Sequence, residues 1–187
     1  LVYGKLFRGA QISGSSDAQI LQNAGVTKEI DLCKSGCGSH MTNTDRYGIE
    51  NYKIDIQNHS SAQAEIRDAA IKMMEDVVND HENLYFHCRV GSDRTGTIAY
   101  ILEGLLGVTA EERYKDYELT HFYLSDRNRY YMRKNSSNDD RRFVYMVYDQ
   151  NLMTNQQIYD YFIHGSTDQQ ADDVLIQAFR TAMIEYD

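Results

Sequence analysis

The 187-residue chain contains neither proline nor tryptophan, and neither absence points to a class of protein. It also has no run of about 18 apolar residues, the length that a transmembrane helix needs, so the sequence predicts no membrane span. No positively charged and then apolar segment suggests a signal peptide. Because the chain begins at Leu1 without a methionine, both a cytoplasmic location and export stay open.

Positive charge and cysteine are scarce as well. The chain has 19 lysines and arginines against 28 aspartates and glutamates, and its formal net charge is −9. This balance argues against a nucleic-acid partner. Any anion site must therefore be a local island of positive charge. Three cysteines, an odd number, do not indicate a disulfide framework.

The most informative segment runs from His87 to Thr97 and reads His-Cys-Arg-Val-Gly-Ser-Asp-Arg-Thr-Gly-Thr. The apolar run 84–86 precedes it and a helical pattern follows it, so the segment joins a buried strand to a helix. Main-chain N–H groups converge at such a junction, and the helix dipole favours negative charge. We therefore expect a phosphate site, which inorganic phosphate or sulfate could also occupy. The same field favours a thiolate at Cys88, which indicates phosphoryl transfer to sulfur.

These residues resemble the signature loop of the cysteine-dependent tyrosine phosphatases, where His-Cys is followed by five residues and Arg-Ser/Thr. The Asp-Arg-Thr-Gly form is most similar to a bacterial branch that includes tyrosine, dual-specificity and phosphoinositide phosphatases. Residues 6–11 and 29–32 resemble the first two strands of that branch, and 117–120 a later helix. The resemblance implies hydrolysis of phosphotyrosine without a cofactor or metal. Dual specificity, or a phosphoinositide or inositol-phosphate substrate, is the alternative.

Strand-like runs near 5–9, 27–32, 51–56 and 84–87 alternate with helical patterns. This alternation predicts an α/β fold with a central, mostly parallel sheet flanked by helices. Several helix starts show the Ser/Thr-x-x-Glu/Gln capping pattern, at Ser16, Ser60, Thr109, Thr154 and Thr167. The chain from about 109 to 187 is helical only. We expect it to pack on the sheet as part of one phosphatase domain spanning 1–187.

The loop supplies the expected nucleophile and phosphate-binding groups. Cys88 would attack phosphorus, and the fork of Arg94 would hold two phosphate oxygens. Main-chain N–H groups would complete the substrate site, which we assign to Arg89, Val90, Gly91, Ser92, Asp93 and Arg94. Thr95 is expected to donate a hydrogen bond to the Cys88 sulfur. His87 is expected to orient the loop from beneath rather than to titrate in catalysis.

Two aspartates are candidates for the general acid that protonates the leaving group and later activates water. Asp93 lies within the loop, and the resemblance favours it. Asp55 lies 33 residues before Cys88, after the strand-like 51–54, a separation typical of a movable acid loop in other branches of the superfamily. The chain lacks the tryptophan and proline often seen in that acid loop. We favour Asp93 and keep Asp55 as the alternative.

Weaker signals lie elsewhere in the chain. Cys33, Cys37 and His40 have a spacing reminiscent of metal ligands, but they lack a second pair, so we expect no metal site. Related chains commonly read Asp-Leu-Arg where this one has Asp31-Leu32-Cys33. A basic, tyrosine-bearing segment at 127–142 is best explained as a solvated polar loop, and recognition of a polyanionic substrate is the alternative.

Two other functions compete with a phosphatase. One is a non-catalytic phosphate-binding module, which has no need of a nucleophilic cysteine. The other is a sulfur transferase of the rhodanese kind, which also places a cysteine in a strand-to-helix loop. The Arg-Thr-Gly exit from the loop fits the second poorly.

Overall fold

The computed structural model describes residues 3–12, 14–33, 47–56, 63–119 and 153–184. Four strands form one sheet: β1 (Leu6–Gly9), β2 (Lys28–Cys33), β3 (Glu50–Ile56) and β4 (Leu84–His87). Their spatial order is β1-β4-β2-β3, and every neighbouring pair is parallel. The expected α/β fold with a parallel sheet is confirmed. Each predicted strand matches an observed one to within a residue at either end.

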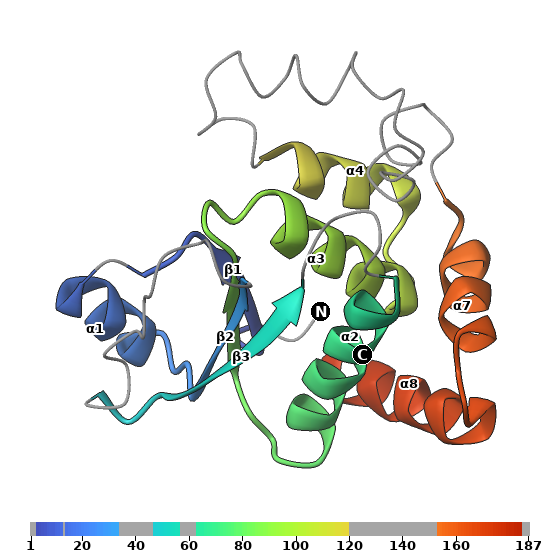
Figure 1. The fold of residues 1–187 in the computed structure, drawn as a ribbon, viewed down its shortest axis with the longest axis horizontal. Coiled ribbons are helices and arrows are strands. Elements are labelled where there is room, and N and C mark those ends of the chain that lie inside the picture. The colour runs from blue at the N-terminus through green and yellow to red at the C-terminus, as the bar shows by residue number, and fades with distance from the viewer. Residues whose placement is uncertain (1–2, 13, 34–46, 57–62, 120–152, 185–187) are drawn as a thin grey trace.

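Six described helices surround this sheet: α1 (Ser15–Asn23), α2 (Gln63–Val78), α3 (Asp93–Leu105), α4 (Ala110–Leu119), α7 (Asn155–His164) and α8 (Gln169–Met183). In Figure 1, α1 lies on one side of the sheet, and the other helices lie on the opposite side. The two carboxyl-terminal helices pack on α2 and α3. Arg67 of α2 donates through Nε to the Phe162 oxygen of α7 over 2.9 Å, and Arg180 of α8 donates to the Leu105 oxygen over 2.6 Å. For its described part, the predicted helical extension is confirmed, and it packs on the helices α2 and α3.

Side-chain caps define two of the predicted helix starts. Thr154 and Gln157 form a complete capping box at α7, and Thr109 forms the same reciprocal bonds with Glu112 at α4. Two starts were misplaced. Helix α1 begins after Gly14 with no side-chain cap, so the Ser16 prediction was wrong. Helix α8 is capped by Asp168, one residue after the predicted Thr167. The predicted start at Ser60 lies outside the described residues.

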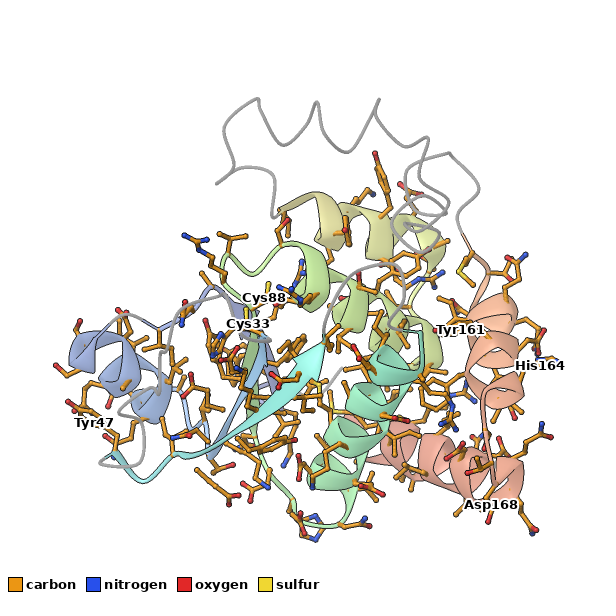
Figure 2. All side chains as sticks on the ribbon, viewed as in Figure 1. Cys33, Tyr47, Cys88, Tyr161, His164 and Asp168 are labelled. Atoms are coloured by element: carbon orange, nitrogen blue, oxygen red, sulfur yellow. The ribbon has the colours of Figure 1, made fainter. Side chains whose placement is uncertain are left out.

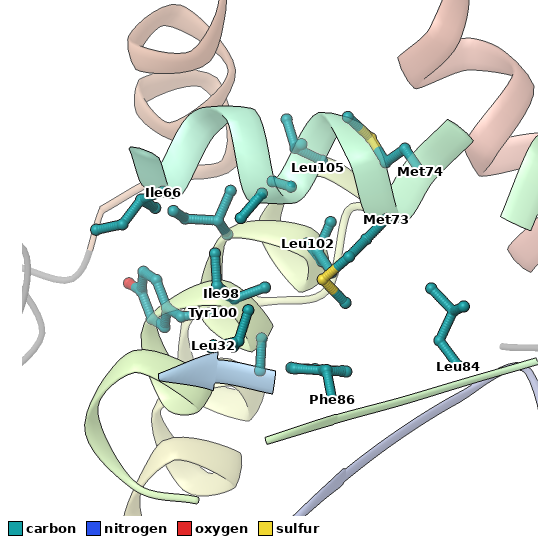
Figure 3. Packing of buried hydrophobic residues seen from close by; sticks show 14 of the residues in the cluster. Leu32, Ile66, Met73, Met74, Leu84, Phe86, Ile98, Tyr100, Leu102 and Leu105 are labelled. Carbon is teal, nitrogen blue, oxygen red and sulfur yellow. The ribbon is translucent and has the colours of Figure 1, made fainter. Parts of the chain in front are cut away.

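The hydrophobic core lies between the sheet and α2 and α3. Figure 3 shows Met73 of α2 and Leu102 of α3 on the side that faces Phe86 of β4, and all three side chains are at most 3% exposed. Each buried side chain of this size contributes about 1.5–3 kcal/mol of transfer free energy. Helix α3 is therefore held firmly on the sheet, and its amino terminus has a fixed position next to the carboxyl end of β4.

Candidate active site

The candidate active site is the loop between β4 and α3, which begins at Cys88. The Cys88 side chain is only 3% exposed and carries a free thiol. Figure 2 shows Cys88 where the sheet meets α3. β4 is hydrogen-bonded on both sides, to β1 and to β2. The strand that ends just before Cys88 is therefore an interior strand of the sheet, as the sequence predicted for a strand-to-helix junction.

The loop is packed tightly against the end of β1. Gly91 has φ of +73°, and a Cβ built there would lie 2.3 Å from the Gly9 oxygen. Only glycine tolerates both the backbone conformation and the close approach. On the same side, the Gln11 N–H donates to the Arg89 oxygen over 3.3 Å. These contacts hold the loop in a closed turn above the amino terminus of α3.

Arg94 reaches from the first turn of α3 to the ends of two strands. Its Nε donates to the Ile56 oxygen of β3 over 2.9 Å, and its Nη1 lies 3.8 Å from the Sγ of Cys33 at the end of β2. The carboxyl ends of parallel strands meet at one edge of a sheet, where ligands of α/β proteins bind. Cys88 and Arg94 therefore lie at this edge together with Cys33.

The loop between β4 and α3 has an exposed part and a buried part. Arg89 and Val90 are exposed, whereas Gly91 and Ser92 are buried. Ser92 begins the helix, because its oxygen accepts from the Gly96 N–H over 2.8 Å. The Arg89 side chain is therefore accessible to solvent. A positive charge that binds a second phosphate group beside the loop would need this accessibility.

Thr95 departs from the sequence-based expectation. Its side chain is completely buried, and its Oγ1 makes no hydrogen bond within the described parts of the chain. The expected hydrogen bond to the Cys88 sulfur is therefore absent. Thr95 lies in the first turn of α3, one residue after Arg94.

The two candidate acids lie in different surroundings. Asp93 is the first residue of α3, and its side chain lies outside what the structure describes. Asp55 belongs to β3, is 53% exposed, and pairs with Lys53 at 3.3 Å. The next residue, Ile56, is fully buried and accepts the hydrogen bond from Arg94. Because side chains alternate along a strand, Asp55 projects to the opposite face from Ile56.

His87 lies beneath the loop, as the sequence predicted. The ring is completely buried, and Nδ1 lies 3.2 Å from the Cys88 oxygen. Its Nε2 lies 2.8 Å from Oε1 of Glu29, a buried carboxylate on β2. Sequence reasoning did not single out Glu29. A signal was present, because interior parallel strands are almost continuously apolar and a charge within one indicates a paired partner.

A shallow cavity of about 400 Å³ lies beside the loop. Its wall includes Val90, Gly91 and the ion pair between Arg8 of β1 and Asp116 of α4, whose Nη2 and Oδ2 are 2.7 Å apart. Arg8 also donates to the Asp116 main-chain oxygen over 2.6 Å. Val90 and Gly91 thus belong both to the loop and to the wall of this cavity. No sequence pattern pointed to Asp116.

Several weaker sequence signals gain little from the structure. Cys33 is disulfide-bonded, whereas Cys37, His40 and the basic segment 127–142 lie outside the described residues. Within the described ranges, no group of three or more His, Cys, Asp or Glu residues could hold a metal ion. In the same part of the chain, no helix has the length and apolar character required to cross a bilayer.

Comparison with known proteins places this site in a family. The model of the tyrosine phosphatase family matches residues 1–169. The chain belongs to this family, and it is an enzyme of the protein-tyrosine-phosphatase type, a phosphatase. A search of curated proteins found no significant match.

A solved structure shares the fold. It is the core catalytic domain of the PP-IP phosphatase SIW14 from S. cerevisiae in complex with citrate. The TM-score is 0.53 at 16% sequence identity, and the match covers 79% of this chain and 83% of that chain. At this identity the likeness concerns the fold, and it confirms the predicted α/β class.

Proposed function

We propose that the chain hydrolyses phosphotyrosine through a cysteinyl-phosphate intermediate, with Cys88 as the nucleophile. The observation that carries the proposal is the position of Cys88 and Arg94 at the two ends of one loop, at the carboxyl edge of the sheet and the amino terminus of α3. Helix N–H groups and a guanidinium supply local positive charge in a chain of net charge −9. The Asp-Arg-Thr-Gly sequence supports assignment to the bacterial branch.

The first step forms a sulfur–phosphorus bond. The Cys88 thiolate attacks phosphorus in line while the bond from phosphorus to the ester oxygen breaks. The guanidinium of Arg94 binds two equatorial oxygens, and the main-chain N–H groups of residues 89–94 bind the others. A carboxylic acid gives its proton to the departing oxygen. We assign this role to Asp93, with Asp55 as the alternative.

The second step restores the enzyme. A water molecule attacks phosphorus and gives a proton to the same carboxylate, and the phosphorus–sulfur bond breaks. Inorganic phosphate leaves, and sulfur departs as a thiolate stabilised by the same loop. One carboxyl group thus serves as acid in the first step and as base in the second.

An inositol phosphate or phosphoinositide is the second candidate substrate. Two observations favour it: Arg89 is an exposed cation within the loop, and the fold is shared with a protein described as a PP-IP phosphatase. An exposed arginine next to the phosphate site could bind a second phosphate group of a polyphosphorylated substrate.

Hydrolysis of p-nitrophenyl phosphate tests the reaction class. We expect phosphate release that vanadate inhibits and that Cys88→Ser abolishes. Binding of phosphate without turnover would instead indicate a non-catalytic module, and cyanide-dependent formation of thiocyanate would indicate a sulfur transferase. A panel of phosphopeptides and inositol phosphates at fixed ionic strength then tests the substrate. If Arg89→Ala lowers activity on inositol phosphates far more than on p-nitrophenyl phosphate, the second substrate class is favoured.

A further inference from the structure

His87 and Glu29 form a buried pair beneath the catalytic loop. Their side chains are 0% and 1% exposed, and His87 Nε2 lies 2.8 Å from Glu29 Oε1. They belong to the neighbouring strands β4 and β2, where the register places Glu29 opposite Tyr85 and Asp31 opposite His87. Because the pair is shielded from solvent, protein groups decide where its protons lie.

Both ring nitrogens of His87 face oxygen acceptors. Nδ1 lies 3.2 Å from the main-chain oxygen of Cys88, which can only accept, so Nδ1 must carry a hydrogen. A neutral imidazole carries one hydrogen in total. The bond between Nε2 and Glu29 therefore needs a second proton, held either by the imidazole or by the carboxyl group.

The surroundings of the ring favour the imidazole as the holder of that proton. A free imidazole binds a proton roughly a hundredfold more tightly than a glutamate carboxylate. The titratable groups facing the ring are Glu29 and Asp31 of β2, and Tyr85 and Cys88 of its own segment. A carboxyl oxygen of Asp31, Oδ1, also lies 4.0 Å from Nδ1. Burial raises the pKa of Tyr85, whose ring centroid lies 5.7 Å away, so the phenol stays neutral and does not compete.

From this geometry we infer that Glu29 holds His87 as an imidazolium, and that this fixed charge stabilises the Cys88 thiolate. The Nδ1 edge of the ring faces Cys88 and the Nε2 edge faces Glu29, so the positive end of the pair is directed toward the loop. Glu29 acts through His87 and has no contact with substrate, which makes it a positioning residue. The inference rests on the proposed function, because a thiolate has a role only if Cys88 is the nucleophile.

The substitution Glu29→Gln tests this arrangement. Glutamine keeps a hydrogen-bond acceptor for Nε2 but removes the charge, and an unpaired imidazolium in a buried site loses its proton. We expect the pH midpoint of Cys88 alkylation by iodoacetate to rise by about one unit. The acidic limb of kcat/KM for p-nitrophenyl phosphate should move with it. Glu50 is an exposed glutamate at the amino end of β3, whereas Cys88 lies at the carboxyl ends of the strands. Glu50→Gln is therefore the matched control and should change neither the alkylation midpoint nor the acidic limb.

A second substitution shows whether Glu29 acts through His87. In a His87→Asn background, Glu29→Gln should produce no further rise in the alkylation midpoint. An undiminished rise in that background would overturn the inference, because Glu29 would then act on the loop directly. No rise in the single variant, or a shift to lower pH, would overturn it as well.

The wild-type protein provides a test that does not depend on a variant folding. Nitrogen-15 spectra of the His87 ring, assigned with His87→Asn, should show both nitrogens protonated throughout the neutral range. One unprotonated nitrogen at neutral pH would place the second proton on Glu29 and end the proposal. If the ring is doubly protonated and Glu29→Gln moves the midpoint but wild type hydrolyses no phosphate ester, the charge arrangement stands and the proposed function fails.

Discussion

The Nε of Arg94 donates a hydrogen bond to the main-chain oxygen of Ile56 over 2.9 Å. This bond joins the first turn of α3 to the carboxyl end of β3, across the edge where Cys88 lies. The orientation of the guanidinium plane is therefore set by the sheet as well as by α3. A bidentate grip on phosphate depends on such an orientation, since the two parallel hydrogen bonds are directional.

Replacement of Arg94 by lysine should reduce kcat/KM for p-nitrophenyl phosphate by roughly 10²–10³-fold. Lysine keeps the positive charge but has neither the planar fork nor an Nε donor for Ile56. Arg89 is an exposed arginine of the same loop. Arg89→Lys is therefore the control and should change the turnover of p-nitrophenyl phosphate little. A fall of less than about tenfold in Arg94→Lys would show that charge alone suffices.

Gly91→Ala should displace the loop and lower both stability and activity. The new Cβ would collide with the Gly9 oxygen, and φ of +73° is unfavourable for alanine. Gly107→Ala separates these two causes, because Gly107 has φ of +88° but open space around its Cβ position. We expect Gly107→Ala to cost about 1 kcal/mol with normal activity. Gly91→Ala should cost more in urea unfolding and lose most hydrolysis; equal behaviour of the two variants would contradict the close packing.

The general acid is identified by the basic limb of the pH–rate profile. Asp93→Asn should remove that limb and lower turnover of aryl esters with poor leaving groups by roughly 10²–10⁴-fold. Asp55→Asn should leave the limb in place. Its exposed pair with Lys53 contributes little, so stability should also stay the same. The reverse pattern would assign the role to Asp55.

Glu103 of α3 should make the protein less stable as pH rises. Burial, followed by the neighbouring Asp116 carboxylate, raises the pKa of Glu103 from 4.5 to about 8. Between these two values the folded chain binds a proton that the unfolded chain lacks, so this contribution is complete below pH 4.5 and is lost as pH approaches 8. Glu103→Gln should flatten the decline in Tm over that range.

Glu111→Gln provides the comparison for Glu103. Glu111 lies on α4 with a side chain that is 76% exposed, so its replacement should leave the pH dependence of Tm as in wild type. A Tm profile that is equally steep in Glu103→Gln would show that Glu103 is ionised in the folded protein.

The sequence predicted the strands and the strand-to-helix position of the loop because their signals are local. Apolar runs such as 84–86 sit between polar segments, and Gly91 lies within a strand-to-helix junction. The contact between Glu29 and His87 could not be predicted in this way. It depends on β4 lying between β1 and β2 and on the register of β2 against β4, which is set by the whole sheet.

The errors at helix starts have a different cause. Thr167 and Asp168 are adjacent and both are good amino-terminal caps, so the pattern alone could not separate them. At α1 the sequence offered Ser16, but the chain enters the helix through Gly14, without any side-chain cap. Thr95 illustrates a third limit: residue type indicated a donor for sulfur, whereas among the described residues its buried hydroxyl has no hydrogen-bond partner.

The interior place of β4 has a consequence for how such an enzyme can acquire new substrates. A strand that is hydrogen-bonded to a neighbour on each side cannot shift without breaking two sets of main-chain hydrogen bonds. The sulfur of Cys88, which follows this strand, therefore has a fixed position. Residues on the rim, among them Arg89, Val90 and Leu119, carry no comparable constraint. Substitutions at these rim residues can therefore change which substrates bind while the position of Cys88 is preserved.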